Sequence, residues 1–154
     1  MTTRAPQTIR LHHLDLPDPY RDGAPSAGNI MVIDDSMTVR TVIEATLRRD
    51  GYQVSSFTDG LAAMAAMARG EVDVPDLLLL DIGLPKMDGY EVARILRGKA
   101  DFGQTVIVML TARDGIIDRF RSKIVGASAF ISKPFKVDFV RAIVRQYIHT
   151  NPHA

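Results

Sequence analysis

The chain has 154 residues, of which 46% are hydrophobic and 24% charged, which is typical of one globular domain. No apolar run approaches the roughly 18 residues of a membrane-spanning helix, and the N-terminus lacks the apolar core of a secretory signal. Cysteine is absent, which excludes disulfide frameworks, thiolate metal sites and a cysteine nucleophile. These features predict a cytoplasmic protein that does not contact a membrane.

The net charge of +1 predicts only weak bulk attraction to nucleic acids or anionic lipids. The charge is unevenly distributed, however. Residues 1–28 sum to zero, residues 29–112 to −4 and residues 113–154 to +5. The basic excess is therefore confined to the C-terminal part of the chain.

Residues 1–28 differ in composition from the rest, with four prolines and two glycines. Such a segment is typical of a disordered extension. The alternative is a short docking segment, because it also contains a cluster of four aliphatic residues: Ile9, Leu11, Leu14 and Leu16. The adjacent His12 and His13 have no nearby Glu or Cys and make a poor metal site.

From residue 30 onward, short apolar runs alternate with segments of helical periodicity. Ser36 or Asp35 can cap the first helix, and Asp88 with Glu91 resembles a capping box for the third. In chain order, the pattern predicts a strand at 30–33, a helix at 37–49, a strand at 53–57, a helix at 61–69, a strand at 77–80, a helix at 88–98, a strand at 106–110, a helix at 116–124, a strand at 129–132 and a helix at 140–148.

Strands that alternate with helices pair in parallel, and the helices cover both faces of the sheet. The sequence therefore predicts an α/β fold with a five-stranded parallel sheet and five surrounding helices. In such sheets the functional site lies beyond the carboxyl ends of the strands. The residues that end each strand are thus the candidate site residues.

Several predicted strands end in residues that suit phosphoryl chemistry. These residues are Asp34, Asp35, Asp81, Thr111 and Lys133. A single Asp at a strand end is usually a cap or turn former. Three convergent carboxylates repel one another, however, and need a cation, and oxygen ligands at phosphoryl sites favour Mg²⁺.

A carboxylate beside Mg²⁺, a hydroxyl and an ammonium group can itself accept a phosphoryl group. The carboxylate attacks phosphorus and forms an acyl phosphate. Lys133 and Mg²⁺ can neutralise the phosphoryl oxygens, and the Thr111 hydroxyl can donate one hydrogen bond.

From about Asn29 to Ile148 the chain resembles the receiver domain of two-component response regulators, the CheY-like family. The resemblance is carried by motifs at four strand ends and in the loop after the third strand. They are Asp34-Asp35-Ser36, Leu78-Leu79-Leu80-Asp81 with Leu84-Pro85 and Met87-Asp88-Gly89, Thr111-Ala112 and Lys133-Pro134-Phe135.

The resemblance implies a flavodoxin-like sheet of order 2-1-3-4-5 and an Mg²⁺-dependent site with Asp81 as phosphoacceptor. Metal-binding groups would be Asp34, Asp35, Asp81 and the backbone carbonyl of Gly83. Lys133 would pair with the phosphoryl group, and the Lys133–Pro134 bond would be cis. Thr111 and Phe130 would be the switch residues.

The same resemblance implies partners and reactions. A sensor histidine kinase or phosphotransfer protein would supply the phosphoryl group, and a downstream protein would read it. Self-phosphorylation from a small phosphodonor and slow self-dephosphorylation would both depend on Mg²⁺. A narrower resemblance, at residues 113–119 and 123–127, is to the PilG-like regulators of twitching motility.

The predicted organisation is an extension at 1–28, a receiver domain at 29–150 and a tail at 151–154. The tail leaves no room for a helix-turn-helix module, so we expect a single-domain regulator without direct DNA binding. The basic excess in residues 113–154 predicts an output surface for an acidic partner. The candidate residues are Arg119, Arg121, Lys123, Lys136, Arg141 and Arg145.

Three alternative functions compete with this interpretation. Phosphatases of the haloacid dehalogenase type need a second Asp two residues after the nucleophile, where this chain has Gly83. The glycine-rich motifs of nucleotide-binding loops are absent. The remaining alternative is a receiver-fold binding module that acts without phosphorylation.

Overall fold

Five parallel strands form one sheet of order β2-β1-β3-β4-β5, so the predicted fold class is confirmed. The computed structural model describes residues 27–112 and 126–149 of the chain. The strands are β1 (Asn29–Ile33), β2 (Gln53–Phe57), β3 (Leu77–Asp81), β4 (Val106–Thr111) and β5 (Ala129–Ser132).

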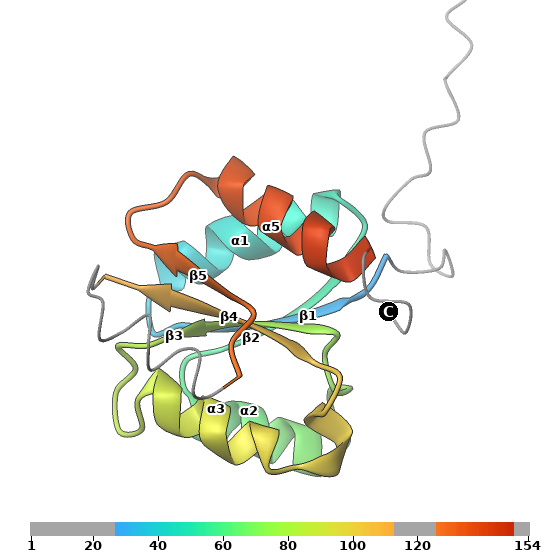
Figure 1. Cartoon of the computed structure of the whole chain (residues 1–154), viewed down its shortest axis with the longest axis vertical. Coiled ribbons are helices and arrows are strands. Elements are labelled where there is room, and N and C mark those ends of the chain that lie inside the picture. The colour runs from blue at the N-terminus through green and yellow to red at the C-terminus, as the bar shows by residue number, and fades with distance from the viewer. Residues whose placement is uncertain (1–26, 113–125, 150–154) are drawn as a thin grey trace, which may run out of the picture.

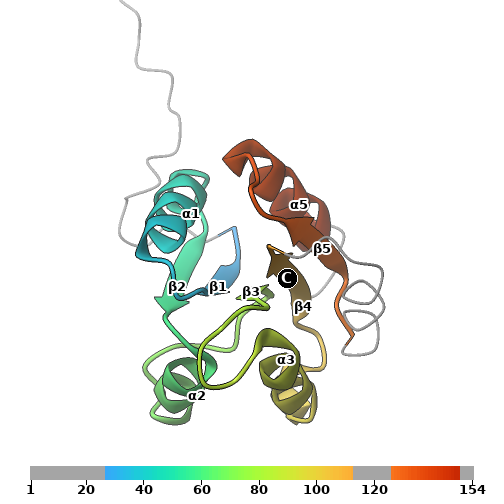
Figure 2. The same cartoon turned by 90° about the vertical axis from the view of Figure 1, so that its left-hand side faces the viewer.

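Helices α1 and α5 cover one face of the sheet, and α2 and α3 cover the other (Figures 1 and 2). The helices are α1 (Met37–Arg49), α2 (Gly60–Ala68), α3 (Gly89–Arg97), the 3₁₀ helix η1 (Ala100–Phe102) and α5 (Val137–His149). The helix predicted at 116–124 lies outside the described residues. The sequence did not predict η1, which is a single turn. No helix in the described ranges is long and apolar enough to cross a membrane.

The uninterrupted apolar run of β3 explains how the sheet buries both of its faces. Leu77 and Leu79 lie in the core beneath α1 and α5, whereas Leu78 and Leu80 lie in the core beneath α2 and α3. Successive side chains of a strand point to opposite faces, so a central strand covered on both sides needs apolar residues throughout. The flanking strands β1 and β4 follow the same rule.

Side chains fix the starts of the helices that lead away from the sheet. The Ser36 hydroxyl accepts a hydrogen bond from the Val39 N–H, and the Asp88 carboxylate accepts one from the Glu91 N–H, as predicted. Asp59 caps α2 in the same way, at 2.8 Å from the Ala62 nitrogen, and this cap was not predicted. Each cap satisfies an N–H that has no partner within its helix.

The start of α3 lies against the end of β3, and only glycine fits there. The Gly89 N–H donates to the Ile82 carbonyl at 3.0 Å. A Cβ on Gly89 would lie 2.3 Å from the Asp81 carbonyl oxygen and 2.8 Å from the Ile82 Cα. The backbone contact therefore holds α3 directly beside the last residue of β3.

Gly89→Ala should destabilise the fold by about 1–3 kcal/mol, because the added methyl group forces two backbone segments apart. Urea denaturation would measure this loss. Gly83→Ala is the matched control, because its Cβ would meet nothing nearer than 3.8 Å. If the Gly89→Ala variant unfolds at the same urea concentration as the wild type, the close approach of the two backbone segments is contradicted.

Candidate functional site

Three carboxylates meet at the carboxyl edge of the sheet, where the sequence predicted them. Asp34 and Asp35 follow β1, and Asp81 is the last residue of the neighbouring strand β3. One carboxylate oxygen from each residue lies within 4.8 Å of the others. Asp34 and Asp81 are buried, whereas Asp35 is exposed at the mouth of the cluster.

Backbone and side-chain bonds hold Asp34 in place. Its N–H donates to the Phe57 carbonyl at 3.1 Å, and its carboxylate accepts from the Ser36 N–H at 2.9 Å. Arg40, in the first turns of α1, donates to the Asp34 carbonyl at 2.7 Å. Arg40 was not among the predicted site residues. Its position four residues after the helix cap Ser36 was the available signal, since that spacing places it one turn into α1.

Asp81 lies between a hydrogen-bond donor and a cation. Its Oδ1 accepts from the Gly83 N–H at 3.1 Å, and its Oδ2 lies 3.5 Å from the Lys133 Nζ. Burial, together with the charge of Asp34, raises the pKa of Asp81 above its usual value, although Lys133 and the Gly83 N–H oppose the rise. The charged form of Asp81 is thus disfavoured, and an added cation would stabilise it.

Lys133 is the cation that the site already contains. Its Nζ donates to the Asp34 Oδ2 at 2.7 Å. Burial by itself would lower the pKa of Lys133, but the hydrogen bond to Asp34 and the charges of Asp34 and Asp81 outweigh it and raise that pKa. Lys133 is therefore protonated and close to two of the three carboxylates.

The β4–β5 pair positions Lys133 and the two predicted switch residues. The Lys133 N–H donates to the Thr111 carbonyl at 2.6 Å, and the Lys133–Pro134 peptide bond is cis, as expected. Thr111 is buried at the end of β4, two residues after Met109, and Phe130 on β5 pairs in register with Met109. Residues two apart share a face, so Thr111 and the half-buried Phe130 lie on the same side of the sheet.

The predicted basic surface is only partly described. Arg119, Arg121 and Lys123 lie outside the described residues, as does Arg113, whereas Lys136 and Arg145 are exposed on the described part of the chain. Arg141, in contrast, already forms ion pairs within the domain. Its guanidinium donates to both carboxylate oxygens of Asp50 at 2.8 Å and to Asp138 at 3.1 Å, so it joins α5 to the end of α1.

The donor set fits Mg²⁺. Three convergent carboxylates supply the hard oxygen ligands that Mg²⁺ prefers at about 2.1 Å, and Asp35 is exposed to solvent, which could supply water ligands. Lys133 offsets only part of their charge. Asp34, Asp35 and Asp81 would hold the ion, and the Gly83 carbonyl remains a predicted fourth group.

Comparison with known proteins agrees with this geometry. The sequence profile of the response regulator receiver domain matches residues 30–145. The chain belongs to this family. It is 31% identical to Protein PilG of Pseudomonas aeruginosa over 119 residues, which are 77% of this chain and 86% of that protein.

Two other relatives define the matched region further. The response regulator MprA of Mycobacterium leprae is 37% identical over 116 residues, and the match covers 75% of this chain but only 49% of MprA. A solved receiver domain, from the sensor histidine kinase PA1611 of Pseudomonas aeruginosa, is 32% identical with a TM-score of 0.67. That match covers 79% of this chain and 98% of the receiver domain, whose structure has a magnesium ion coordinated in its active-site cleft.

Proposed function

We propose that this receiver domain acts in the cytoplasm and accepts a phosphoryl group on Asp81 from a sensor histidine kinase or phosphotransfer protein. The observation that carries the proposal is the position of the Asp81 carboxylate, close to both Lys133 and two further carboxylates. Lys133 supplies one positive charge there. The neighbouring carboxylates Asp34 and Asp35 are suited to hold a magnesium ion, which would supply further positive charge.

The reaction follows from the groups present. An Asp81 oxygen attacks phosphorus, the bond from phosphorus to the leaving nitrogen or oxygen of the donor breaks, and an acyl phosphate forms. Lys133, displaced from Asp34 or shared with it, can pair with a phosphoryl oxygen, and Thr111 can donate its hydroxyl. Bound Mg²⁺ would supply neutralisation of the phosphoryl charge. The protein's own task is alignment, which accounts for the rigid setting of Asp34 and Asp81.

A small phosphodonor tests the proposal directly. The protein should gain one phosphoryl group from acetyl phosphate in the presence of Mg²⁺, detected by intact mass, and lose it after alkaline treatment. Chelation of Mg²⁺ should prevent the gain. A protein that stays unmodified while it still binds its partner would instead be the phosphorylation-independent binding module.

We further propose that the downstream partner binds the surface made by β5 and the start of α5. Phe130, Phe135 and Phe139 line a hollow of about 570 Å³ there, and the exposed Lys136 lies at its edge. Phe139 is 51% exposed. An apolar hollow with a basic rim fits an acidic partner that presents apolar side chains. Arg119, Arg121 and Lys123 would extend the basic rim, whereas Arg141 already pairs with Asp50.

Charge reversal at this surface should slow association with the partner and flatten its salt dependence. The variant combines Arg119→Glu, Lys123→Glu and Lys136→Glu, and the readout is the association rate of the phosphorylated protein across a salt series. Arg49→Glu, an exposed position on α1, is the single-site control. An unchanged association rate in the triple variant would place the output surface elsewhere.

The lifetime of the phosphoryl group should depend on Gly83. A Cβ at this position would lie 3.8 Å from the Asp81 Oδ1, so a polar side chain there could hold a water in line with the acyl phosphate. Gly83→Asn should shorten the lifetime about tenfold, and Gly83→Ala, which has no polar atom, should leave it unchanged. Arg113→Ala should also shorten it, because the long cation at position 113 would otherwise shield the site. Unchanged lifetimes in both Gly83→Asn and Arg113→Ala would reject this explanation.

A further inference from the structure

The outer side of α2 is apolar along its whole length. The helix consists only of Gly, Leu, Ala and Met, and its inner side buries Ala63 and Ala66 against the sheet. On the outer side, Leu61 is 50% exposed and Ala68 is exposed. A helix that is apolar on all sides is normally covered on all sides.

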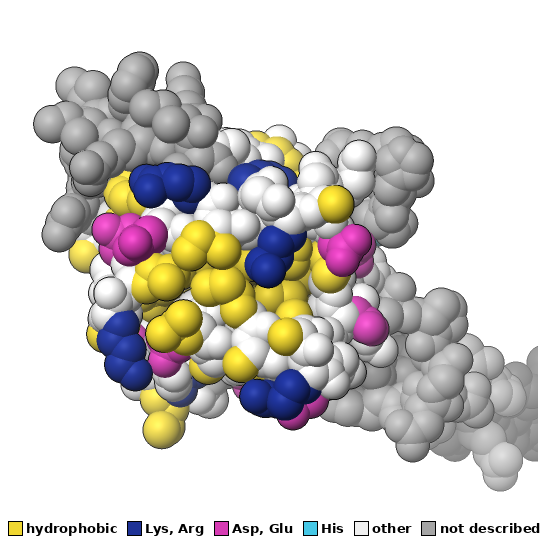
Figure 3. Space-filling model, turned by 90° about the horizontal axis from the view of Figure 1, so that it is seen from below, with side chains coloured by type: hydrophobic (Ala, Val, Ile, Leu, Met, Phe, Trp, Pro, Cys, Tyr) yellow, Lys and Arg dark blue, Asp and Glu magenta, His cyan; other side chains and the backbone are white. Residues whose placement is uncertain are grey.

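The neighbouring helix α3 extends this surface. A Cβ on Gly60 would lie 2.5 Å from a methyl group of Val92, so the two helices touch, and Ile95, one turn after Val92, is 39% exposed. Figure 3 shows hydrophobic side chains gathered on this side of the molecule, with charged side chains around them. We call this surface the α2 face. It consists of Leu61, Met64, Ala65, Ala68 and Ile95.

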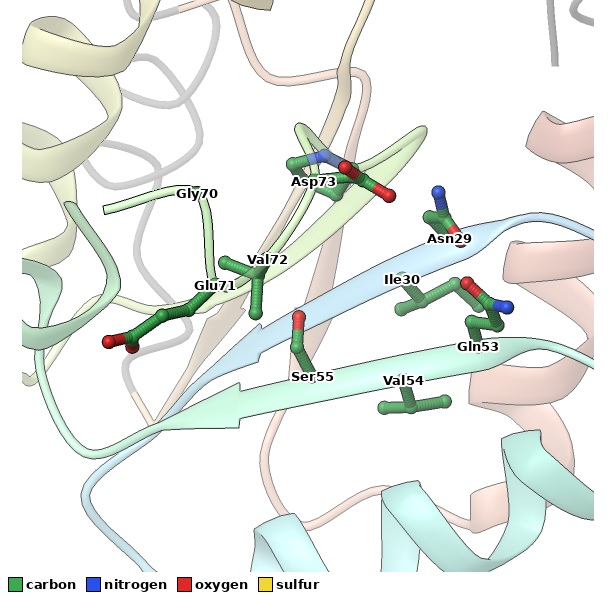
Figure 4. Close-up of a pocket in the computed structure, with 10 residues that line it drawn as sticks. Asn29, Ile30, Gln53, Val54, Ser55, Gly70, Glu71, Val72 and Asp73 are labelled. Atoms are coloured by element: carbon green, nitrogen blue, oxygen red, sulfur yellow. The ribbon is translucent and has the colours of Figure 1, made fainter. Parts of the chain in front are cut away.

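The described chain begins at the same end of the sheet as the loop that follows α2. The Ala27 N–H donates to the Gly51 carbonyl at 3.1 Å, which places Ala27 beside the start of the edge strand β2. A hollow of about 330 Å³ separates the starts of β1 and β2 from the loop that follows α2 (Figure 4). Asn29 and Gln53 line one side of it, and Gly70 lines the other.

We propose that residues 9–16 of the same molecule dock on the α2 face. These eight residues contain four aliphatic side chains: Ile9, Leu11, Leu14 and Leu16. The eleven residues from Leu16 to Ala27 reach up to about 36 Å when extended. Helix α2, with nine residues, is about 14 Å long, so roughly 22 Å of that reach remain for the path from Ala27 past the hollow to α2.

Residues 9–16 are favoured over a second molecule because they are covalently joined to the domain that carries the α2 face. A segment joined by a short flexible linker is present at an effective concentration in the millimolar range, well above that of a separate partner in ordinary samples. The linker is suited to the turn around the sheet edge, because it contains Pro17, Pro19, Pro25 and Gly23, which disfavour regular structure. The proposal does not depend on phosphorylation of Asp81.

Disulfide trapping in the full chain tests the proposal, since the protein has no cysteine of its own. Asp15→Cys combined with Ala68→Cys should form an intramolecular disulfide under mild oxidation. The control combines Asp15→Cys with Val42→Cys, at a 45% exposed position on α1, across the sheet. We expect the first pair to close at least about tenfold faster, as effective concentration governs closure. Equal rates, or disulfides between two molecules only, would overturn the proposal.

Hydrogen exchange supplies a second measurement without cysteines. Leu14→Asp should speed the exchange of α2 amides in the full chain about tenfold, because it places a charge in the docked segment. Thr8→Asp adds the same charge just outside the aliphatic cluster and should leave α2 exchange unchanged. If Leu14→Asp leaves the exchange of α2 amides at the wild-type rate, the α2 face has another occupant.

Discussion

Asp81→Asn should reduce phosphorylation by acetyl phosphate to the background level and leave the fold intact. The amide has nearly the shape of the carboxylate but is a far poorer nucleophile. The variant should also be more stable than the wild type in Mg²⁺-free buffer. Burial and the charge of Asp34 oppose ionisation of Asp81 in the folded protein, so the charged carboxylate destabilises the fold at neutral pH.

Two measurements check this prediction. Intact mass after incubation with acetyl phosphate and Mg²⁺ reports the phosphoryl group, and thermal unfolding without Mg²⁺ reports stability. Asp101→Asn makes the same chemical change at an exposed residue of η1 and should affect neither. Phosphorylation of Asp81→Asn at the wild-type rate would show that another residue is the nucleophile.

The alternating pattern was sufficient to predict the sheet because its strands are short, apolar and separated by helices. Leu77–Leu80 has no polar residue in a run of four, which is compatible only with burial on both faces. The site followed from the same pattern, since parallel strands bring their carboxyl ends to one edge. Asp34, Asp81 and Lys133 are 47 and 52 residues apart in sequence, yet their side chains lie within ion-pair range.

Contacts between distant surfaces were not predictable from the pattern. The ion pair of Arg141 with Asp50 joins two helices on one face, and nothing local distinguishes Arg141 from a solvated arginine. The close approach of Gly89 to the end of β3 depends on how the intervening loop folds back, and a lone glycine at a helix start is common for other reasons. Such contacts depend on tertiary packing, which periodicity does not encode.

Thr111→Ala should uncouple the conformational response from phosphorylation. Thr111 is buried at the end of β4, and its carbonyl accepts a hydrogen bond from the Lys133 N–H, which fixes its backbone at the carboxyl edge of the sheet. A hydrogen bond from its hydroxyl to a charged phosphoryl oxygen would be worth about 1.5–3 kcal/mol. Loss of that bond should shift the two-state equilibrium of the phosphorylated protein about 10- to 150-fold toward the inactive state.

Phe130 offers a direct readout of this equilibrium. The chain has no tryptophan, so Phe130→Trp introduces a single tryptophan, which can be excited apart from the four tyrosines, at the half-buried predicted switch position on the same side of the sheet as Thr111. In the Phe130→Trp protein, phosphorylation should change the tryptophan emission when Thr111 is intact. Thr111→Ala should remove most of this change, although it should slow phosphorylation less than about tenfold. Thr111→Ser, which keeps the hydroxyl, should restore the response. If Thr111→Ala gives the full emission change, the hydroxyl does not couple the phosphoryl group to Phe130, and the signal must leave the site through another residue beside Asp81.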